Sequence, residues 1–187
     1  MPHEATPGIG VAPEHRRVGA VDHSDIQPGT DLGQIAIETV VAQDCAEQLT
    51  EKTVQITLGD AVRTEQRKGH PVALLDVTFT PVGTGAPVSI GDIRRTILLR
   101  PADGTDTWPV DTEFVAGDEP VTVTLDVLPA NCRLHTVTED KRGTYFPFET
   151  TTDAGDGLFY LAASTAVKEE FYAYIADYCG WDSSTAD

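Results

Sequence analysis

One short stretch of the chain concentrates side chains that could do chemistry: His135, Glu139, Asp140 and Lys141. A histidine and two carboxylates are metal ligands, and a lysine ammonium attracts anions, so a loop could gather them into a binding site. A zinc site needs about four ligands, however, and a single histidine with scattered carboxylates falls short of that. We therefore expect a structural turn, in which a carboxylate accepts backbone N–H bonds and Lys141 pairs locally.

Other catalytic patterns are missing from the sequence. It contains no Gly-x-Ser-x-Gly nucleophile motif, no Gly-x-Gly-x-x-Gly and no phosphate-binding loop. The Asp- and Gly-rich stretches 103–106 and 153–157 lack the final glutamate of an EF-hand loop and are typical of hairpin turns. We predict no catalytic, cofactor-binding or metal-binding residue. A glycosidase-type carboxylate pair stays open, because 30 acidic residues always include some close pair.

The charge balance narrows the range of partners. The chain has 187 residues, with 30 acidic against 13 basic side chains and a formal net charge of −17. A field of that sign repels phosphate backbones and anionic lipid heads, which argues against nucleic acid and membrane surfaces as partners. No apolar stretch is long enough for a membrane-spanning helix, so we expect no membrane insertion.

Short apolar runs separated by turn residues dominate the chain from residue 34 onward. Alternating Val, Ile, Leu and Phe residues predict strands at 34–41, 53–58, 72–79, 88–99, 108–115, 121–127, 145–151 and 158–161. The clearest of these alternates perfectly at Val121, Val123, Leu125 and Val127, which we expect to point into the core. Many short strands at this spacing indicate a mostly β, immunoglobulin-like antiparallel sandwich.

One helix is predicted near the end of the chain. Ser164 or Thr165 can cap its N-terminus, and Gly180 stands where a left-handed C-cap would be. Between the caps, apolar residues recur at helical spacing: Val167, Phe171, Tyr174, Ile175 and Tyr178. We expect this stripe to pack on the sandwich, with Trp181 covering its end.

Two segments of the sequence look like a repeat. Residues 37–45 and 124–132 each resemble a strand that leads to Cys after Asp or Asn, and they are about one immunoglobulin-like module apart. Aligning the two segments at their cysteines puts the alternating apolar positions out of phase by one residue, so the repeat requires a bulge or a gap. It predicts that the chain begins inside a first module, and it divides the chain into a disordered arm or linker (1–33), a remnant hairpin of that module (34–60), the immunoglobulin-like sandwich with its helix (71–181) and a polar tail (182–187).

The second half of the chain carries a resemblance to known sequences. Residues 131–146 read NCRLHTVTEDKRGTYF, and 178–181 read YCGW. Together they resemble a group of uncharacterised secreted or lipid-anchored β-sandwich proteins of high-GC Gram-positive bacteria, which share a C-x-x-H…E-D-K-x-G-T-x-F segment and a final C-G-W. The resemblance covers about residues 71–181 and implies an exported protein. It brings no known activity and no catalytic residues.

The three cysteines, Cys45, Cys132 and Cys179, have no metal-binding spacing. They could be three buried thiols. Alternatively, Cys132 at the end of a strand could bridge to Cys179 at the end of the helix, leaving Cys45 as an odd thiol, or Cys45 could pair with Cys132. We favour the bridge from Cys132 to Cys179, and because disulfides persist outside the reducing cytosol, it would place the protein outside the cell or on its surface.

The function that we expect is a non-catalytic extracellular or cell-envelope interaction module. Its partner would be an unknown protein or envelope component, with no cofactor. The alternative is a hydrolase whose carboxylate site the sequence does not reveal. A buried acidic pair in a concave pocket would favour the hydrolase, whereas a solvated acidic surface would favour the interaction module.

Overall fold

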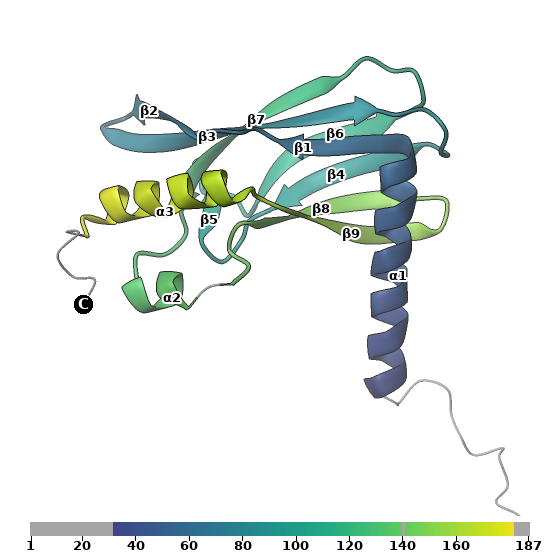
Figure 1. Cartoon of the computed structure of the whole chain (residues 1–187), viewed down its shortest axis with the longest axis horizontal. Coiled ribbons are helices and arrows are strands. Elements are labelled where there is room, and N and C mark those ends of the chain that lie inside the picture. The colour runs from purple at the N-terminus through teal and green to yellow at the C-terminus, as the bar shows by residue number, and fades with distance from the viewer. Residues whose placement is uncertain (1–31, 140, 182–187) are drawn as a thin grey trace, which may run out of the picture.

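The computed structural model describes residues 32–139 and 141–181, and two antiparallel sheets make up most of this part of the chain (Figure 1). The first sheet contains β1 (Val54–Leu58), β2 (Arg63–Arg67), β3 (His70–Pro81), β5 (Leu99–Pro101) and β7 (Val121–Pro129). The second contains β4 (Val88–Arg94), β6 (Thr107–Phe114), β8 (Tyr145–Thr152) and β9 (Gly155–Ala162). Three helices accompany them: α1 (Leu32–Thr53), α2 (Leu134–Thr138) and α3 (Thr165–Cys179). The predicted mostly β sandwich with a C-terminal helix is confirmed at this level.

The strand order joins residues that are distant in the chain. It is β1–β3–β7–β5 in the first sheet, with β2 also paired to β3, and β6–β4–β8–β9 in the second. The strands β2 and β3 form a hairpin in which Arg67 pairs with His70. Its two turn residues, Lys68 and Gly69, have φ of 52° and 83°, the left-handed pair that matches the twist of a tight hairpin.

The core between the sheets is built from alternating apolar residues and a cluster of aromatic rings. Phe79 of the first sheet stacks on Phe114 of the second, with ring centroids 5.2 Å apart. Phe146 of β8 lies 6.3 Å from Phe171 of α3, so the helix belongs to the same core. Aromatic pairs at these separations contribute beyond the area that they bury.

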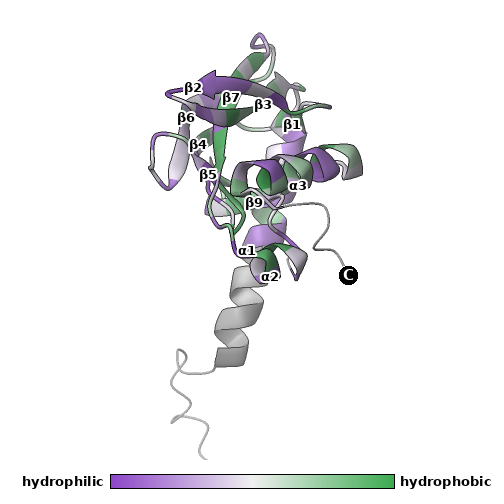
Figure 2. Ribbon diagram, turned by 90° about the vertical axis from the view of Figure 1, so that its left-hand side faces the viewer, coloured by the Kyte–Doolittle hydropathy of each residue, from purple (hydrophilic) through white to green (hydrophobic). Residues whose placement is uncertain are grey.

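Helix α3 begins and ends where the sequence predicts. The Ser164 hydroxyl accepts a hydrogen bond from the Val167 N–H, and Gly180 takes the left-handed C-cap with φ of 68°. Buried residues on one face pack into the sandwich: Val167, Phe171, Tyr174 and Ile175. Figure 1 shows this helix below β3 of the first sheet, running on from the end of β9, and Figure 2 shows that it carries both hydrophobic and hydrophilic residues. Trp181 packs partly buried against the core, as expected.

The predicted hairpin over 34–60 is wrong, because residues 32–53 form helix α1 and only Val54–Leu58 is a strand. That strand pairs with β3 of the same sandwich, so it is not the remnant of another module. The proposed repeat fails with it, because one copy is helical and the other is strand β7. The physical signal for the helix is a stretch from 34 to 53 that is rich in Ala, Glu and Gln and has no Gly or Pro. The expectations for residues 1–31 and for the polar tail (182–187) lie outside the described residues.

Smaller corrections concern the strands. The predicted strand 88–99 is two strands in different sheets, because the chain leaves β4 after Arg94 and pairs again as β5. Strand β2 was not predicted, since all five of its residues are exposed and polar and show no alternation. In β7, Leu125 and Val127 are buried as expected and Val123 is half-buried, but Val121 is 37% exposed at the end of the sandwich.

Candidate functional site

The polar cluster singled out in the sequence lies on and just after helix α2, where a turn was expected. His135 Nε2 lies 3.2 Å from Glu139 Oε2, one helical turn away, and both side chains are largely exposed. Lys141 is also exposed, and Asp140 lies outside the described residues. Within residues 41, 43–139 and 141–181, no three His, Cys, Asp or Glu side chains come close enough to hold a metal ion. The described part of this cluster therefore has the character of a solvated helix end.

The acidic turns use their carboxylates locally. Asp103 Oδ1 accepts hydrogen bonds from the Thr105 N–H at 2.9 Å and from its hydroxyl at 2.6 Å. These two bonds lower the pKa of Asp103 below its ordinary value, and the bond from the Thr105 hydroxyl has the larger effect. Asp106 pairs with Arg95, with Nε and Oδ1 2.7 Å apart. The turn interpretation of this stretch is confirmed.

A groove opens where strands β3 and β7 part. They pair up to Ala73 and Val127, after which β7 continues alongside β5. The hydroxyl of Tyr174, from α3, sits at this fork, 3.0 Å from the Pro71 carbonyl and 3.1 Å from the Val127 carbonyl, to which it can donate. Burial raises the pKa of Tyr174 to about 12, against the opposing effect of a hydrogen bond from the Ala73 backbone.

The groove has an apolar floor and an aromatic wall. It encloses about 380 Å³, a volume typical of ligand sites. Val72, Ala102 and Leu128 contribute apolar surface. The rings of His70 and Tyr178 also line it, with centroids 6.5 Å apart and planes tilted by 42°. Such a floor and wall suit an apolar or aromatic group.

The rim of the groove carries charges that are unequally compensated. Arg67 contacts Asp126 at 3.3 Å and Glu65 at 3.4 Å, so one positive charge meets two negative ones. Lys68, at the tip of the hairpin, is exposed and makes no hydrogen bond or ion pair with any residue that the structure describes. With Lys68 these side chains carry no net formal charge, and Asp103 on the opposite flank makes the rim slightly negative.

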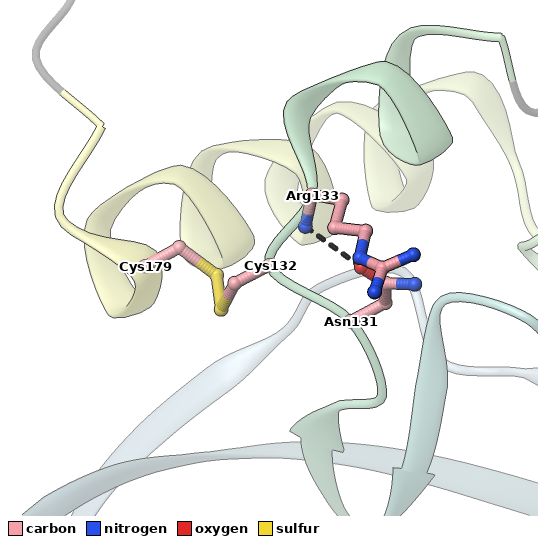
Figure 3. Close-up of a disulfide and its surroundings, with 4 residues drawn as sticks. All are labelled: Asn131, Cys132, Arg133 and Cys179. Carbon is pink, nitrogen blue, oxygen red and sulfur yellow. Dashed lines mark hydrogen bonds between the residues drawn. A yellow bond between two sulfur atoms is a disulfide. The ribbon is translucent and has the colours of Figure 1, made fainter.

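The disulfide lies next to this groove in the chain (Figure 3). Cys132 and Cys179 are bonded, with Cα atoms 5.5 Å apart, which confirms the predicted pairing. Cys179 directly follows Tyr178, so the bond holds the end of α3 against the loop after β7. On the loop side, Asn131 Oδ1 accepts a hydrogen bond from the Arg133 N–H at 2.7 Å. Cys45 is a free, exposed thiol in α1.

A second depression of about 410 Å³ lies over the second sheet. Its acids are Glu149 and Asp156, and each already has a partner. Arg94 donates to Glu149 at 2.5 Å, and the Thr151 hydroxyl donates to Asp156 at 2.7 Å. Gly91 lines the floor, where a Cβ would meet Glu149 at ordinary contact distance.

Comparison with family models, curated proteins and solved structures finds no match to this chain. The function therefore has to be argued from the chain's own residues. Among the helices that the structure describes, none combines the length and the apolar composition that a membrane crossing needs.

Sequence reasoning missed the groove, although some signals for it were present. The Lys68–Gly69 pair is a hairpin signal, and it would have placed Arg67 and His70 next to each other across the turn. No local pattern could bring Ala102, Leu128 and Tyr178 to the same place, because they come from three separate elements.

Proposed function

We propose that this protein is a non-catalytic extracellular or cell-envelope interaction module. The observation that carries the proposal is the placement of its acidic residues. Among the side chains that the structure describes, no Asp or Glu is buried, and the buried polar residues are all threonines. A carboxylate that acts as a general acid or base at neutral pH usually needs burial or a close like charge to raise its pKa.

The disulfide supports the proposed location outside the cell or on its surface. Bonds of this kind are rare in the reducing cytosol and persist in secreted and envelope compartments. The resemblance of residues 71–181 to secreted and lipid-anchored proteins favours the same location. The strongly acidic charge of the chain disfavours nucleic acid and anionic membrane surfaces as partners.

The same proposal includes an immunoglobulin-like sandwich. The neighbours β1–β3–β7–β5 correspond to strands A, B, E and D of that fold, and β4–β8–β9 correspond to C, F and G. One feature departs from it: β5, in the place of strand D, precedes β6, which stands beside the C strand. Because proteins with this fold have many different functions, the fold alone does not argue for an interaction module. The argument also needs the exposed placement of the acidic residues.

The alternative of a carboxylate hydrolase has one candidate location, the depression that contains Glu149 and Asp156. Both acids are at least partly exposed and already bonded, to Arg94 and Thr151. This geometry favours the interaction module.

Location and bond state together test the proposal. Cells that produce the protein naturally would be fractionated, and Cys132 and Cys179 would be mapped by non-reducing peptide mass analysis. We expect the bonded form in the envelope or medium and, after photo-crosslinking on intact cells, a partner that unlabelled protein displaces. Reduced thiols in a cytosolic protein would refute the proposed location. Hydrolysis of a glycoside or ester that Glu149→Gln abolishes would establish the alternative.

A further inference from the structure

We propose that the outer face of the second sheet binds a neutral glycan of the cell envelope, in the depression lined by Arg94, Glu149 and Asp156 and on the adjoining ring of Tyr160. The inference rests on the proposed interaction function, which it extends by naming a site and the chemical class of the envelope component. Strands β4, β8 and β9 form the floor of the depression, and its volume of about 410 Å³ lies in the range of small-molecule sites.

An apolar flank adjoins the depression on the same face of the sheet. Phe159 is buried in the core, so its neighbours Leu158 and Tyr160 face outward along β9. Across the strand pair, Glu149 stands opposite Leu158, and Pro147 stands opposite Tyr160. Tyr160 is 37% exposed. An exposed tyrosine ring next to a proline offers a platform for the apolar C–H face of a sugar ring.

The charged side chains of the depression keep hydrogen-bonding capacity in reserve. Arg94 Nε donates to Glu149 Oε1 at 2.5 Å, and Asp156 Oδ1 accepts from the Thr151 hydroxyl at 2.7 Å. Toward the residues that the structure describes, the three charged side chains make no other hydrogen bond or ion pair. One oxygen of each carboxylate and most N–H groups of Arg94 are therefore open to a ligand. A sugar hydroxyl both donates and accepts, so neighbouring hydroxyls of one ring can bind a carboxylate and the guanidinium together.

The balance of charge in the depression favours a neutral ligand. Arg94 supplies one positive charge against two negative ones from Glu149 and Asp156, a net charge of −1 in a chain of −17. Phosphate or uronate groups would be repelled by the depression and by the chain as a whole. A basic peptide would leave the Arg94 guanidinium, which can only donate, facing another cation. A polyhydroxyl chain matches the donor and the acceptors without adding charge.

A glycine keeps the floor of the depression open. At Gly91, a Cβ would lie 3.5 Å from Glu149 Cβ and 3.6 Å from its Oε2, so a longer side chain there would cover the carboxylate. Gly91 lies at an irregularity of β4, where the register with β6 and β8 shifts. The bonds from Arg94 and Thr151 hold the two carboxylates before a ligand arrives, which reduces the conformational entropy that binding costs.

Hexasaccharides test the class of ligand on the full, disulfide-bonded chain labelled with ¹⁵N. The neutral probes are cellohexaose, mannohexaose and galactohexaose, and the charged comparisons are hexagalacturonate and hexalysine. We expect at least one neutral probe to shift the amide signals of Thr151, Gly157 and Tyr160 at about millimolar concentration. At low salt, hexagalacturonate should bind at least about five-fold more weakly than the best neutral probe, and this gap should narrow as added salt screens the repulsion.

Substitutions with matched controls test whether the depression is the site. Tyr160→Ala should weaken binding about five- to ten-fold by removing the platform, whereas Leu134→Ala, at another exposed apolar residue, should not. Glu149→Gln should weaken binding about five-fold or more by removing a charged acceptor, whereas Glu169→Gln, at an exposed residue of α3, should not.

A third substitution closes the depression. Gly91→Leu should cover Glu149 and abolish binding, whereas Thr64→Leu, on the exposed strand β2, should leave binding unchanged. Near-ultraviolet circular dichroism shows that each variant is folded.

Several results would overturn the inference. Failure of all three neutral probes to bind at about ten millimolar, or signal changes confined to other surfaces, would remove the site. Tighter binding of hexalysine or of hexagalacturonate would indicate a basic or an acidic ligand in place of a neutral glycan. These results leave the interaction function standing, because crosslinking on intact cells tests that function separately. Cleavage of a bound hexasaccharide that Glu149→Gln abolishes would keep the site and replace the interaction function with the hydrolase alternative.

Discussion

Removing the Cys132–Cys179 bond should lower the free energy of unfolding by about 4 kcal/mol. The bond closes a loop with a sequence separation of 47 residues, and the chain-entropy relation gives about that value for such a loop. Because Val167, Phe171 and Ile175 are buried against the sandwich, we expect it to fold with α3 in place when the bond is absent. A loss of this size corresponds to a fall in the melting temperature of roughly 8–16 °C.

Urea unfolding at equilibrium measures this loss. The double variant Cys132→Ser, Cys179→Ser would be compared with the oxidised protein and with Cys45→Ser. Because Cys45 is an exposed free thiol, its replacement should change stability by less than about 0.5 kcal/mol. The unfolding slope should rise in the double variant, since an uncrosslinked chain exposes more surface when unfolded.

The reasoning would be refuted by a loss below about 1 kcal/mol at an unchanged slope. That result would mean that the crosslink does not restrict the unfolded chain as the entropy relation assumes. A loss well above the predicted value would show that α3 depends on the bond for docking. Hydrogen exchange at Ala176 to Gly180 would identify that case by early opening of the helix end.

Two further variants test the fork between β3 and β7, where Tyr174 is bonded, and the turn that contains Gly85, next to the C-terminal end of α1. Tyr174→Phe should cost about 1–2 kcal/mol by removing the hydroxyl bonds to the sheet, whereas the exposed Tyr160→Phe should cost almost nothing in thermal melts. The folded pKa of Tyr174, about 12, exceeds its unfolded value of about 10, because burial disfavours the phenolate. Its contribution to stability is therefore complete below pH 10 and is lost as pH rises through 12, by up to about 3 kcal/mol. Unfolding titrations in which Tyr174→Phe keeps this slope would contradict the assignment. Gly85→Ala should destabilise the protein by about 1–3 kcal/mol, because the new Cβ would lie 1.9 Å from the buried Thr53 hydroxyl oxygen. That hydroxyl donates a hydrogen bond to the Ala86 carbonyl. Gly91→Ala, whose Cβ makes ordinary contacts, is the matched control in the same urea assay, and equal effects of the two variants would argue against the clash.

Local patterns predicted the elements in which one face is buried. Period-two alternation placed β7, because its alternate residues Leu125 and Val127 face the core. The cap at Ser164 and the left-handed Gly180 placed both ends of α3, since these positions satisfy backbone groups that the helix leaves unpaired. The pairing of Cys132 with Cys179 followed from the ends of those same two elements.

Local patterns failed where the spacing of apolar residues does not distinguish a helix from a strand. The apolar residues between 34 and 41 fit a strand in a short window, and only the longer run without Gly or Pro distinguishes helix α1. The exposed strand β2 has no buried face and owes its place to its hairpin with β3. The amphipathic pattern alone therefore could not predict either element.

By itself, the amino-acid sequence determined the sandwich class, the C-terminal helix with its caps and the acidic surface, because each depends on composition or on spacing within one element. Only the tertiary structure decided the groove, because its floor joins Val72, Ala102 and Leu128 from three parts of the chain. The ion pair between Arg67 of β2 and Asp126 of β7 was likewise decided by folding, because β3 lies between these two strands in the sheet. Contacts between distant segments depend on strand order and register, and no local periodicity in the sequence encodes these.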